Sequence, residues 1–235
     1  MEKTIGEEGE DFNLSQASRA MNIEPDEDQI KKYDQYPDSG GFIKNIIIFL
    51  LFAILGLTIY LFYNGRWILG IIGIIATLFL GLLTFVFGSA TKKAAYQNGL
   101  IIPAVIINTN PIEILAMADM RSTDEQAPVY GFQKIKINTL PNHKIEINEK
   151  VPCVTLFGMA IKGYRRHFEP RPISWGFKDA SLIRQTIEVI SGDQTENEFF
   201  KTEWEMLYKA KDKISEETAR DTVLFFDADL NEVKV

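Results

Sequence analysis

Two long apolar runs, separated by a short polar turn, dominate the hydropathy pattern of the chain. The first covers residues 43–63 and the second covers residues 67–88. Each is about 20 residues long, which at ~1.5 Å rise per residue allows a helix to cross a ~30 Å hydrocarbon core. The linker Asn64-Gly65-Arg66 is too short to form a domain. The pattern therefore predicts an antiparallel pair of transmembrane helices, a two-helix hairpin.

Basic residues around the two runs predict their orientation. Lys31, Lys32 and Lys44 precede or open the first run, Lys92-Lys93 follows the second, and only Arg66 lies in the turn. Because Lys and Arg in short flanks remain in the cytoplasm, we expect a multi-pass protein with both termini cytoplasmic. The middle of each run holds no ionisable residue, which favours an anchor over a channel or transporter.

Small residues recur along one face of the second run, in steps of three or four positions. The stripe consists of Gly70, Gly73, Thr77, Gly81, Thr84 and Gly88. Small side chains let membrane helices approach closely. We expect the stripe to pack against Ala53 and Gly56 of the first run, or against a second copy of the chain in a homo-oligomer.

The segment before the first run is strongly acidic. Residues 1–42 hold 4 Lys or Arg and 11 Asp or Glu. Low apolar content with high net charge predicts a disordered cytoplasmic tail. A recognition tail that orders on a partner is the alternative.

Residues 99–213 read as a separate cytoplasmic domain that begins with short strands. Apolar or alternating stretches bounded by turn signals cover residues 100–107, 112–120, 129–138, 144–147 and 151–158. Several short strands at this spacing are typical of a small antiparallel barrel or sandwich.

The period then changes towards that of a helix. Residues 180–190 carry an apolar stripe, with Asp179 as N-cap and Gly192 beyond the end. A second helix opens at the capping box Thr195–Glu198 and covers one face or end of the barrel. Residues 214–235 are expected to form an acidic tail with a docking segment at 222–226. The predicted fold class is membrane-anchored α+β: a two-helix transmembrane hairpin, then a small antiparallel β-barrel-like domain with two C-terminal helices.

Composition excludes several classes of protein. The 235 residues have a formal net charge of −7, with a single Cys and 2 His. One cysteine excludes a disulfide framework and a Cys-cluster metal site, and two histidines leave little for a His-based one. An acidic chain without a long basic stripe argues against nucleic acid as a partner.

The residues that could carry chemistry are few. Cys153 lies within an apolar strand, where a free thiol acts as a small hydrophobe, and His143 lies in a turn that we expect to be solvent-exposed. Recognised nucleotide, hydrolase and metal motifs are absent from the sequence. We therefore expect no catalytic residues, no metal site and no cofactor.

One basic cluster stands out, in the loop of residues 162–172. Its candidate binding residues are Arg165, Arg166, His167 and Arg171. Arginine offers planar, bidentate donors to carboxylate or phosphate, so an anionic partner fits: lipid headgroups, or an acidic tail such as residues 1–42. The alternative is a solvated loop whose arginines pair with nearby acids.

A family resemblance accompanies these residues. Gly99–Val105, Asn110-Pro111, Val151–Val154 and above all the Glu169–Gly176 segment, EPRPISWG, resemble domain of unknown function 3239, an uncharacterised bacterial family. The resemblance covers roughly residues 43–213. It implies a bacterial inner-membrane protein with a small β domain, and it brings no catalytic or binding residues with it.

Three functional hypotheses follow. The first is a non-enzymatic, membrane-anchored cytoplasmic interaction module that contacts lipid and an unknown protein partner. The second is an accessory or immunity-type protein of a bacterial secretion or toxin system. The third is an enzyme that uses Arg165, Arg166, His167 and Glu169 on a phosphate-bearing substrate, which a deep pocket joining His167 to Glu169 and Asp179 would favour.

Overall fold

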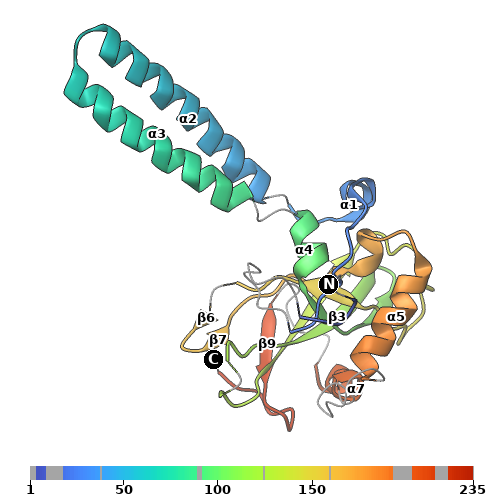
Figure 1. The fold of residues 1–235 in the computed structure, drawn as a ribbon. Helices are drawn as coiled ribbons and strands as arrows, with labels where there is room; N and C mark the ends of the chain where they lie inside the picture. Colours follow the sequence, from blue (N-terminus) through green and yellow to red (C-terminus); the bar gives the residue numbers. More distant parts are fainter. Residues whose placement is uncertain are drawn as a thin grey trace. The chain divides into compact units, whose positions relative to one another are not determined.

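The chain forms two structural units, as the computed structural model in Figure 1 shows. One unit is Tyr36–Ala94, and the other combines Met1–Gln35 with Ala95–Val235. The structure describes residues 4–8, 18–37, 39–88, 92–123, 125–158, 160–192, 203–214 and 222–234, without the side chains of 39–44 and 83–88.

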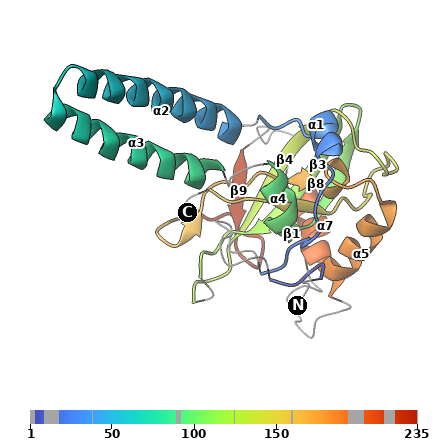
Figure 2. The same ribbon diagram turned by 45° about the horizontal axis from the view of Figure 1, so that its top comes forward.

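The first unit consists of two long antiparallel helices, visible in both ribbon views (Figures 1 and 2). Helix α2 is Ser39–Tyr63, of 25 residues, and helix α3 is Trp67–Gly88, of 22 residues. Between them the chain reverses at Gly65, whose φ of 71° suits glycine. Both helices are apolar on all sides, so their packing leaves most large side chains outside.

Glycines allow the two helices to approach closely. A Cβ at Gly70 would lie 2.7 Å from the ring of Phe62, and one at Gly73 would collide with Thr58. Thr77 donates from its hydroxyl to the Gly73 carbonyl at 2.9 Å, and Gly81 lies at ordinary contact distance from Leu51. The described part of the stripe thus faces α2 within one chain.

The contact partners of the stripe differ from those expected. Ala53 is exposed, and Gly56 has open space around its missing side chain. The side chains of Thr84 and Gly88 lie outside the described residues.

The predicted two-helix transmembrane hairpin is wrong. Among the described residues, one helix, Asn45–Tyr63, is long and apolar enough to cross a membrane. The corresponding apolar part of α3, Trp67–Leu82, is shorter. At ~1.5 Å per residue it covers about 24 Å, less than a ~30 Å hydrocarbon core.

A four-stranded antiparallel sheet with the order β2-β3-β4-β9 forms the main part of the second unit. Its strands are Ala104–Thr109 (β2), Ile112–Asp119 (β3), Tyr130–Ile137 (β4) and Val223–Phe226 (β9). Strands β2 and β3 pair with a bulge at Ile107, where the register shifts. Strand β9 lies in the predicted acidic tail and pairs with β4, so the docking segment is an edge strand.

Two smaller antiparallel sheets complete the strands. They are β1-β5-β8 (Leu100–Ile102, Cys153–Thr155 and Arg171–Pro172) and the hairpin β6-β7 (Ala160–Ile161 and Tyr164–Arg165). These sheets are open, and the expected barrel-like closure is wrong because β2 and β9, the outermost strands of the larger sheet, do not pair with each other. The strand predicted at 144–147 is also wrong: these residues form a loop that exposes Ile145 and Ile147.

Two helices pack on the strands. Helix α5 is Ala180–Ser191, and it is capped as its sequence predicts: Asp179 accepts from the Ser181 amide, and Gly192 has a φ of 80°. Helix α7 is Glu203–Lys213 and contacts β2 and β3, whereas α5 contacts β1. The capping box expected at 195–198 lies outside the described residues.

A short turn fixes the centre of the core. The 3-10 helix η1, Ile173–Trp175, is fully buried, and the Trp175 indole N–H donates to the Thr139 carbonyl at 2.8 Å. Together with Trp175, the largest fully buried side chains among the described residues include Tyr96, Phe132, Phe168, Ile101, Ile102, Ile114, Leu115 and Met117.

The amino-terminal segment is part of this unit rather than a solvated tail. Ala20 and Met21 are fully buried, and helix α1, Glu27–Tyr33, contacts η1. Arg19 forms a buried ion pair with Glu203 of α7 at 2.5 Å and donates from Nε to the Ile101 carbonyl at 2.8 Å. The predicted disordered tail is therefore wrong for residues 18–35.

A second buried ion pair joins the other end of the same segment to the strands. Asp34, just after α1, pairs with Arg171 of β8, which also binds Glu169 at 2.7 Å. Within this region the backbone amide of Asp26 donates to the Gly176 carbonyl at 2.8 Å. The segment 18–35 is held at both ends by pairs of opposite charge.

Replacing Glu203 with Gln should strongly destabilise the domain. The Arg19 guanidinium would stay buried without its carboxylate, and breaking a buried pair in this way costs about 3 kcal/mol. Urea unfolding of the full chain in nonionic detergent measures the effect. The control is Glu205→Gln on the exposed face of the same helix, which should change stability by no more than about 0.5 kcal/mol; equal effects for the two variants would contradict the expectation.

Candidate functional site

The basic loop predicted at 162–172 begins as a tight hairpin. Strands β6 and β7 pair through Ala160–Arg165 and Ile161–Tyr164, with Lys162-Gly163 between them. Both turn residues have positive φ, 53° and 89°, which is the conformation of a type I′ turn. The hairpin gives Arg165 a defined position at the end of β7.

Backbone hydrogen bonds attach this hairpin to the segment that follows β3. The Arg165 amide donates to the Met120 carbonyl at 2.8 Å, and the Ser122 amide donates to the Gly163 carbonyl at 2.9 Å. Arg121 and Tyr164 form an isolated bridge between the two segments. Two arginines distant in the sequence, Arg121 and Arg165, are thereby brought to one place.

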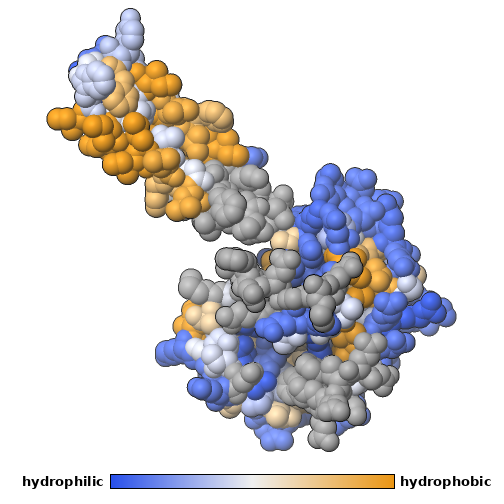
Figure 3. Space-filling model, viewed as in Figure 1, coloured by the Kyte–Doolittle hydropathy of each residue, from blue (hydrophilic) through white to orange (hydrophobic). Residues whose placement is uncertain are grey.

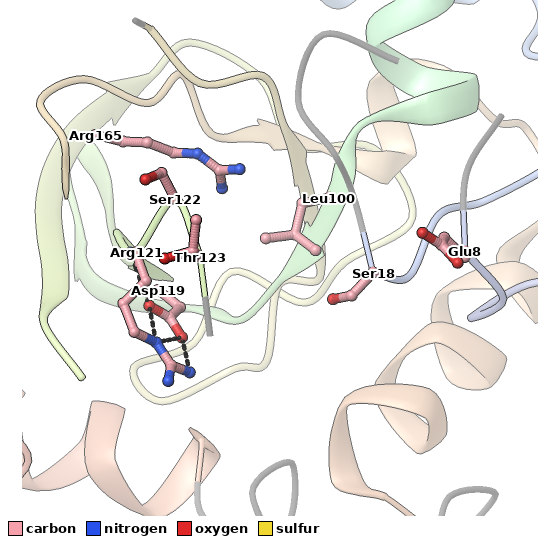
Figure 4. A pocket seen from close by; sticks show the side chains of 8 residues that line it. All are labelled: Glu8, Ser18, Leu100, Asp119, Arg121, Ser122, Thr123 and Arg165. Carbon is pink, nitrogen blue, oxygen red and sulfur yellow. Dashed lines mark hydrogen bonds and ion pairs between the residues drawn. The ribbon is translucent and has the colours of Figure 1, made fainter. Parts of the chain in front are cut away.

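These segments surround a pocket of about 260 Å³, shown in Figure 4. Arg165 extends over Ser122, the Asp119–Arg121 pair lies below, and Ser18 and Glu8 lie beyond Leu100 (Figure 4). The complete lining is Glu8, Ser18, Leu100, Asp119, Arg121, Ser122, Thr123 and Arg165.

The two arginines are held in different ways. Arg121 forms a fork on the Asp119 carboxylate, with Nη2 at 2.5 Å and Nε at 2.9 Å from Oδ2. The Arg165 guanidinium lies 4.1 Å from the centre of the Phe157 ring. Burial lowers the pKa of Arg165 below its usual value, and the Asp119 carboxylate opposes this shift.

The pocket is suited to a small anionic or strongly polar group. Arg121 largely neutralises Asp119, and the Glu8 carboxylate lies on the far side of the pocket, beyond Leu100 (Figure 4). Arg165 is the cation that lies next to the hydroxyls of Ser122 and Thr123 (Figure 4). Guanidinium and hydroxyl groups are donors that phosphate and carboxylate oxygens accept. The residues that the structure describes include no group of three or more His, Cys, Asp or Glu that could hold a metal ion.

Arg171 does not belong to this pocket, contrary to the sequence interpretation. It is 5 % exposed and is held between Asp34 and Glu169. Burial by itself lowers the pKa of the Arg171 guanidinium, but the neighbouring carboxylates of Asp34 and Glu169 raise this pKa above its usual value. Arg171 therefore binds an acid of residues 1–42, one of the anionic partners that the sequence suggested for this loop, and it does not face solvent.

The other two candidates also lie apart from the pocket. Arg166 is half-buried, and His167 is exposed, with its carbonyl accepting from the Gly158 amide at 2.9 Å. Glu169 and Asp179 are exposed as well, and Asp179 caps α5. Neither this pocket nor the second one described below includes His167, Glu169 or Asp179 among its lining residues.

Buried groups outside the pocket have shifted pKa values. Burial raises the pKa of the Cys153 thiol well above its usual range, which suppresses the thiolate. Burial, and secondly the nearby Asp34 carboxylate, raise the pKa of the Tyr96 hydroxyl. Both side chains thus remain in their neutral forms inside the core.

His143 is buried, and its expected solvent exposure is wrong. Its side chain is 0 % exposed, with Nδ1 lying 3.5 Å from Glu149 Oε1. Burial lowers the pKa of the imidazole below its usual 6.5, and Glu149 acts in the opposite direction.

The sequence interpretation missed Arg121, Asp119 and the hydroxyl residues. They belong to a polar segment after an apolar strand, which reads as an ordinary loop. The spacing Asp-x-Arg at the end of the strand was an available signal, since it places both side chains on one side of extended backbone. They come close to Arg165 because the β6–β7 hairpin binds the segment after β3. No local sequence pattern indicates this contact.

Comparison with protein families gives a match over residues 87–215 to DUF3239, described as "protein of unknown function". The match covers more than half of the chain. The chain belongs to this family. The resemblance to the family is thereby confirmed, but the match begins at residue 87 and does not include the two apolar runs that the resemblance was taken to cover. DUF3239 brings no assigned role.

Comparison with individual proteins adds one structure. A crystal structure described as a "putative membrane protein from Corynebacterium diphtheriae" has 20 % sequence identity and a TM-score of 0.42. The alignment covers 54 % of this chain and 98 % of that chain. The search of curated proteins gave no match.

His143 should make the domain less stable in mild acid. Because its pKa is lowered in the folded state, the folded chain binds fewer protons than the unfolded chain near pH 6.5. Its contribution to stability is present above that pH and is lost as the pH falls. Urea unfolding of the full chain in detergent, at about pH 7.5 and about pH 5.5, should show a smaller pH dependence for His143→Gln than for the wild type.

The second histidine provides the matched control for this measurement. His167 is exposed, so His167→Gln should keep the wild-type pH dependence. If His143→Gln keeps it too, the buried imidazole has no part in the acid sensitivity.

Proposed function

We propose that this DUF3239 protein is a non-enzymatic, membrane-anchored interaction module of the bacterial cytoplasmic membrane. In this proposal the helical unit Tyr36–Ala94 attaches the chain to the bilayer. The mixed α/β domain binds an anionic group in the Arg121–Arg165 pocket on the cytoplasmic side.

The observation that carries the proposal is the apolar exterior of the helical unit. Among the described residues, all of the exposed large apolar side chains except Ile145, Ile147 and Ile161 lie on α2, α3 or the turn between them. Figure 3 shows this concentration as the orange surface of the two helices. An exposed apolar area of this extent is unfavourable in water and favourable in lipid.

We place both chain termini on one side of the membrane because the domain contains the segments that come before and after the helical unit. Residues before and after the helical unit fold together, through Arg19–Glu203 and Asp34–Arg171. A single folded domain lies on one side of a membrane, so both flanks of the helical unit lie on that side. In this proposal the unit enters the bilayer and returns to the same side, without carrying the chain across. Lys31, Lys32 and Lys92-Lys93 lie in or next to these flanks, which favours the cytoplasm.

The anionic partner that we propose for the pocket is a lipid headgroup. A domain that continues directly from a membrane-attached unit meets anionic headgroups at high local concentration, and each basic residue near such a surface contributes about 1 kcal/mol. A protein carboxylate is the competing occupant.

Membrane attachment and sidedness can be tested in one experiment. Exposed Lys144 is replaced by Cys, since Cys153 is fully buried and protected from labelling. An impermeant maleimide should label the chain after cell lysis and not before, and the labelled chain should stay in the membrane pellet after alkaline carbonate washing. Release into the supernatant would contradict attachment, and labelling of intact cells would contradict the cytoplasmic side.

Two double variants connect the attachment to the exposed apolar surface. Phe49→Asp with Phe52→Asp should release the chain, because each acid costs about 3 kcal/mol in the centre of a bilayer. Ile145→Asp with Ile147→Asp alters exposed apolar residues of the domain and should leave the chain in the pellet.

Headgroup binding should appear as slower hydrogen exchange of the pocket backbone. The full chain is placed in nanodiscs of neutral lipid, with or without anionic phosphatidylglycerol. Amides of 120–123 and 164–165 should exchange more slowly with the anionic lipid, and salt should reduce this protection. Arg165→Gln should abolish it, whereas Arg184→Gln, on the exposed face of α5, should not; protection that is the same in both lipids would favour a protein partner instead.

A further inference from the structure

A second and larger pocket lies between α7 and the main sheet. Its volume is about 500 Å³, within the range of small-molecule sites. Three strands and the carboxyl end of α7 contribute its lining, which consists of Ile107, Asn108, Glu113, Leu115, Lys134, Lys211 and Ile214. All belong to one structural unit, and none of them lines the Arg121–Arg165 pocket.

The most unusual residue of this pocket is Lys134. It lies in the middle of β4, opposite Leu115 of β3, and it is 8 % exposed. It has no hydrogen-bond or ion-pair partner among the residues that the structure describes. Lysine side chains are rarely buried to this extent. The Lys134 Nζ does not belong to the buried polar atoms without a partner in the described part of the chain, so its ammonium opens onto the pocket that the residue lines.

Protection of a sheet edge does not account for this lysine. Inward-pointing lysines occur on edge strands, where they prevent pairing with other chains. Strand β4 lies between β3 and β9, so its backbone is paired on both sides. Protection of an edge therefore does not explain why a lysine occupies this position.

A second ammonium group lines the same pocket from the opposite wall. Lys211 of α7 donates to the Asn148 side-chain oxygen at 2.6 Å, and Tyr208 donates to the Asn148 carbonyl at 3.3 Å. These bonds hold the end of α7 in place next to β2. With two ammonium groups and the single carboxylate of Glu113, the lining has a net positive charge.

The remaining walls are largely aliphatic. Ile107 is the bulged residue of β2, and the bulge directs its side chain differently from its neighbours. Leu115 lies on strand β3, and Ile214 directly follows α7. A ligand that fits both parts of the lining has a charged head and an apolar body.

We propose that this pocket binds a small amphiphilic anion, with a carboxylate or phosphate head at Lys134 and Lys211 and a short aliphatic body along Ile107, Leu115 and Ile214. The bound head gives the two ammonium groups an anionic partner in addition to the Glu113 carboxylate, which lines the same pocket. This site is independent of membrane attachment and of the Arg121–Arg165 pocket.

Thermal unfolding of the full chain in nonionic detergent tests the proposal with four soluble probes. Hexanoate and butyl phosphate should each raise the midpoint with increasing concentration, because a ligand that binds only the folded state stabilises it. Hexanol, which has the same body without a charge, and inorganic phosphate, which has no body, should have weaker effects. The tighter of the two amphiphilic anions identifies the preferred head.

Variants of the two lysines give the decisive result. Lys134→Met keeps the approximate length of the side chain and removes its charge, so it should bind hexanoate and butyl phosphate about tenfold or more weakly. Lys211→Met should weaken binding as well, while Lys209→Met on the exposed face of α7 should keep wild-type affinity.

Several results would overturn the proposal. Equal binding of hexanol and hexanoate would remove the role of the charge, and wild-type affinity in Lys134→Met would remove the role of this lysine. A failure of both anions to shift the wild-type midpoint at millimolar concentration would show that the pocket binds neither.

Discussion

Two buried ion pairs determine the organisation of this protein. Arg19–Glu203 and Asp34–Arg171 connect the amino-terminal segment to α7 and β8, across 184 and 137 positions of sequence. Taking four charges out of water is costly, and the pairs are tolerable because each charge meets its opposite and Arg19 and Arg171 each have a further acceptor. Removing either pair would leave residues 18–35 without their strongest contacts to the domain.

This constraint makes the helical unit an insertion into one domain. Without the two pairs, the chain would consist of a tail, the helical unit and a domain in succession. With them, residues on both sides of Tyr36–Ala94 belong to the same folded body.

The same constraint divides the basic residues of the 162–172 segment by role. Arg171 neutralises Asp34 inside the domain, whereas Arg165 reaches the pocket with Arg121 because a type I′ turn and two backbone hydrogen bonds place it there. Both residues are arginines of the same short segment, so their sequence context does not distinguish them. What separates their roles is the charge that each one meets after folding, which also leaves Lys134 as the buried cation without a partner among the described residues.

Local sequence alone determined the features that depend on neighbouring residues. The α5 caps at Asp179 and Gly192, the hairpins of β2, β3 and β4, the apolar character of α2 and α3, and the family membership all follow from short patterns with a known period or turn chemistry. Tertiary structure decided the open sheets with β9 at one edge, the ordered amino-terminal segment, and the contents of both pockets. Those features depend on which distant charges and strand edges meet, and a buried ion pair leaves no periodic signal because each partner, taken alone, reads as a solvated residue.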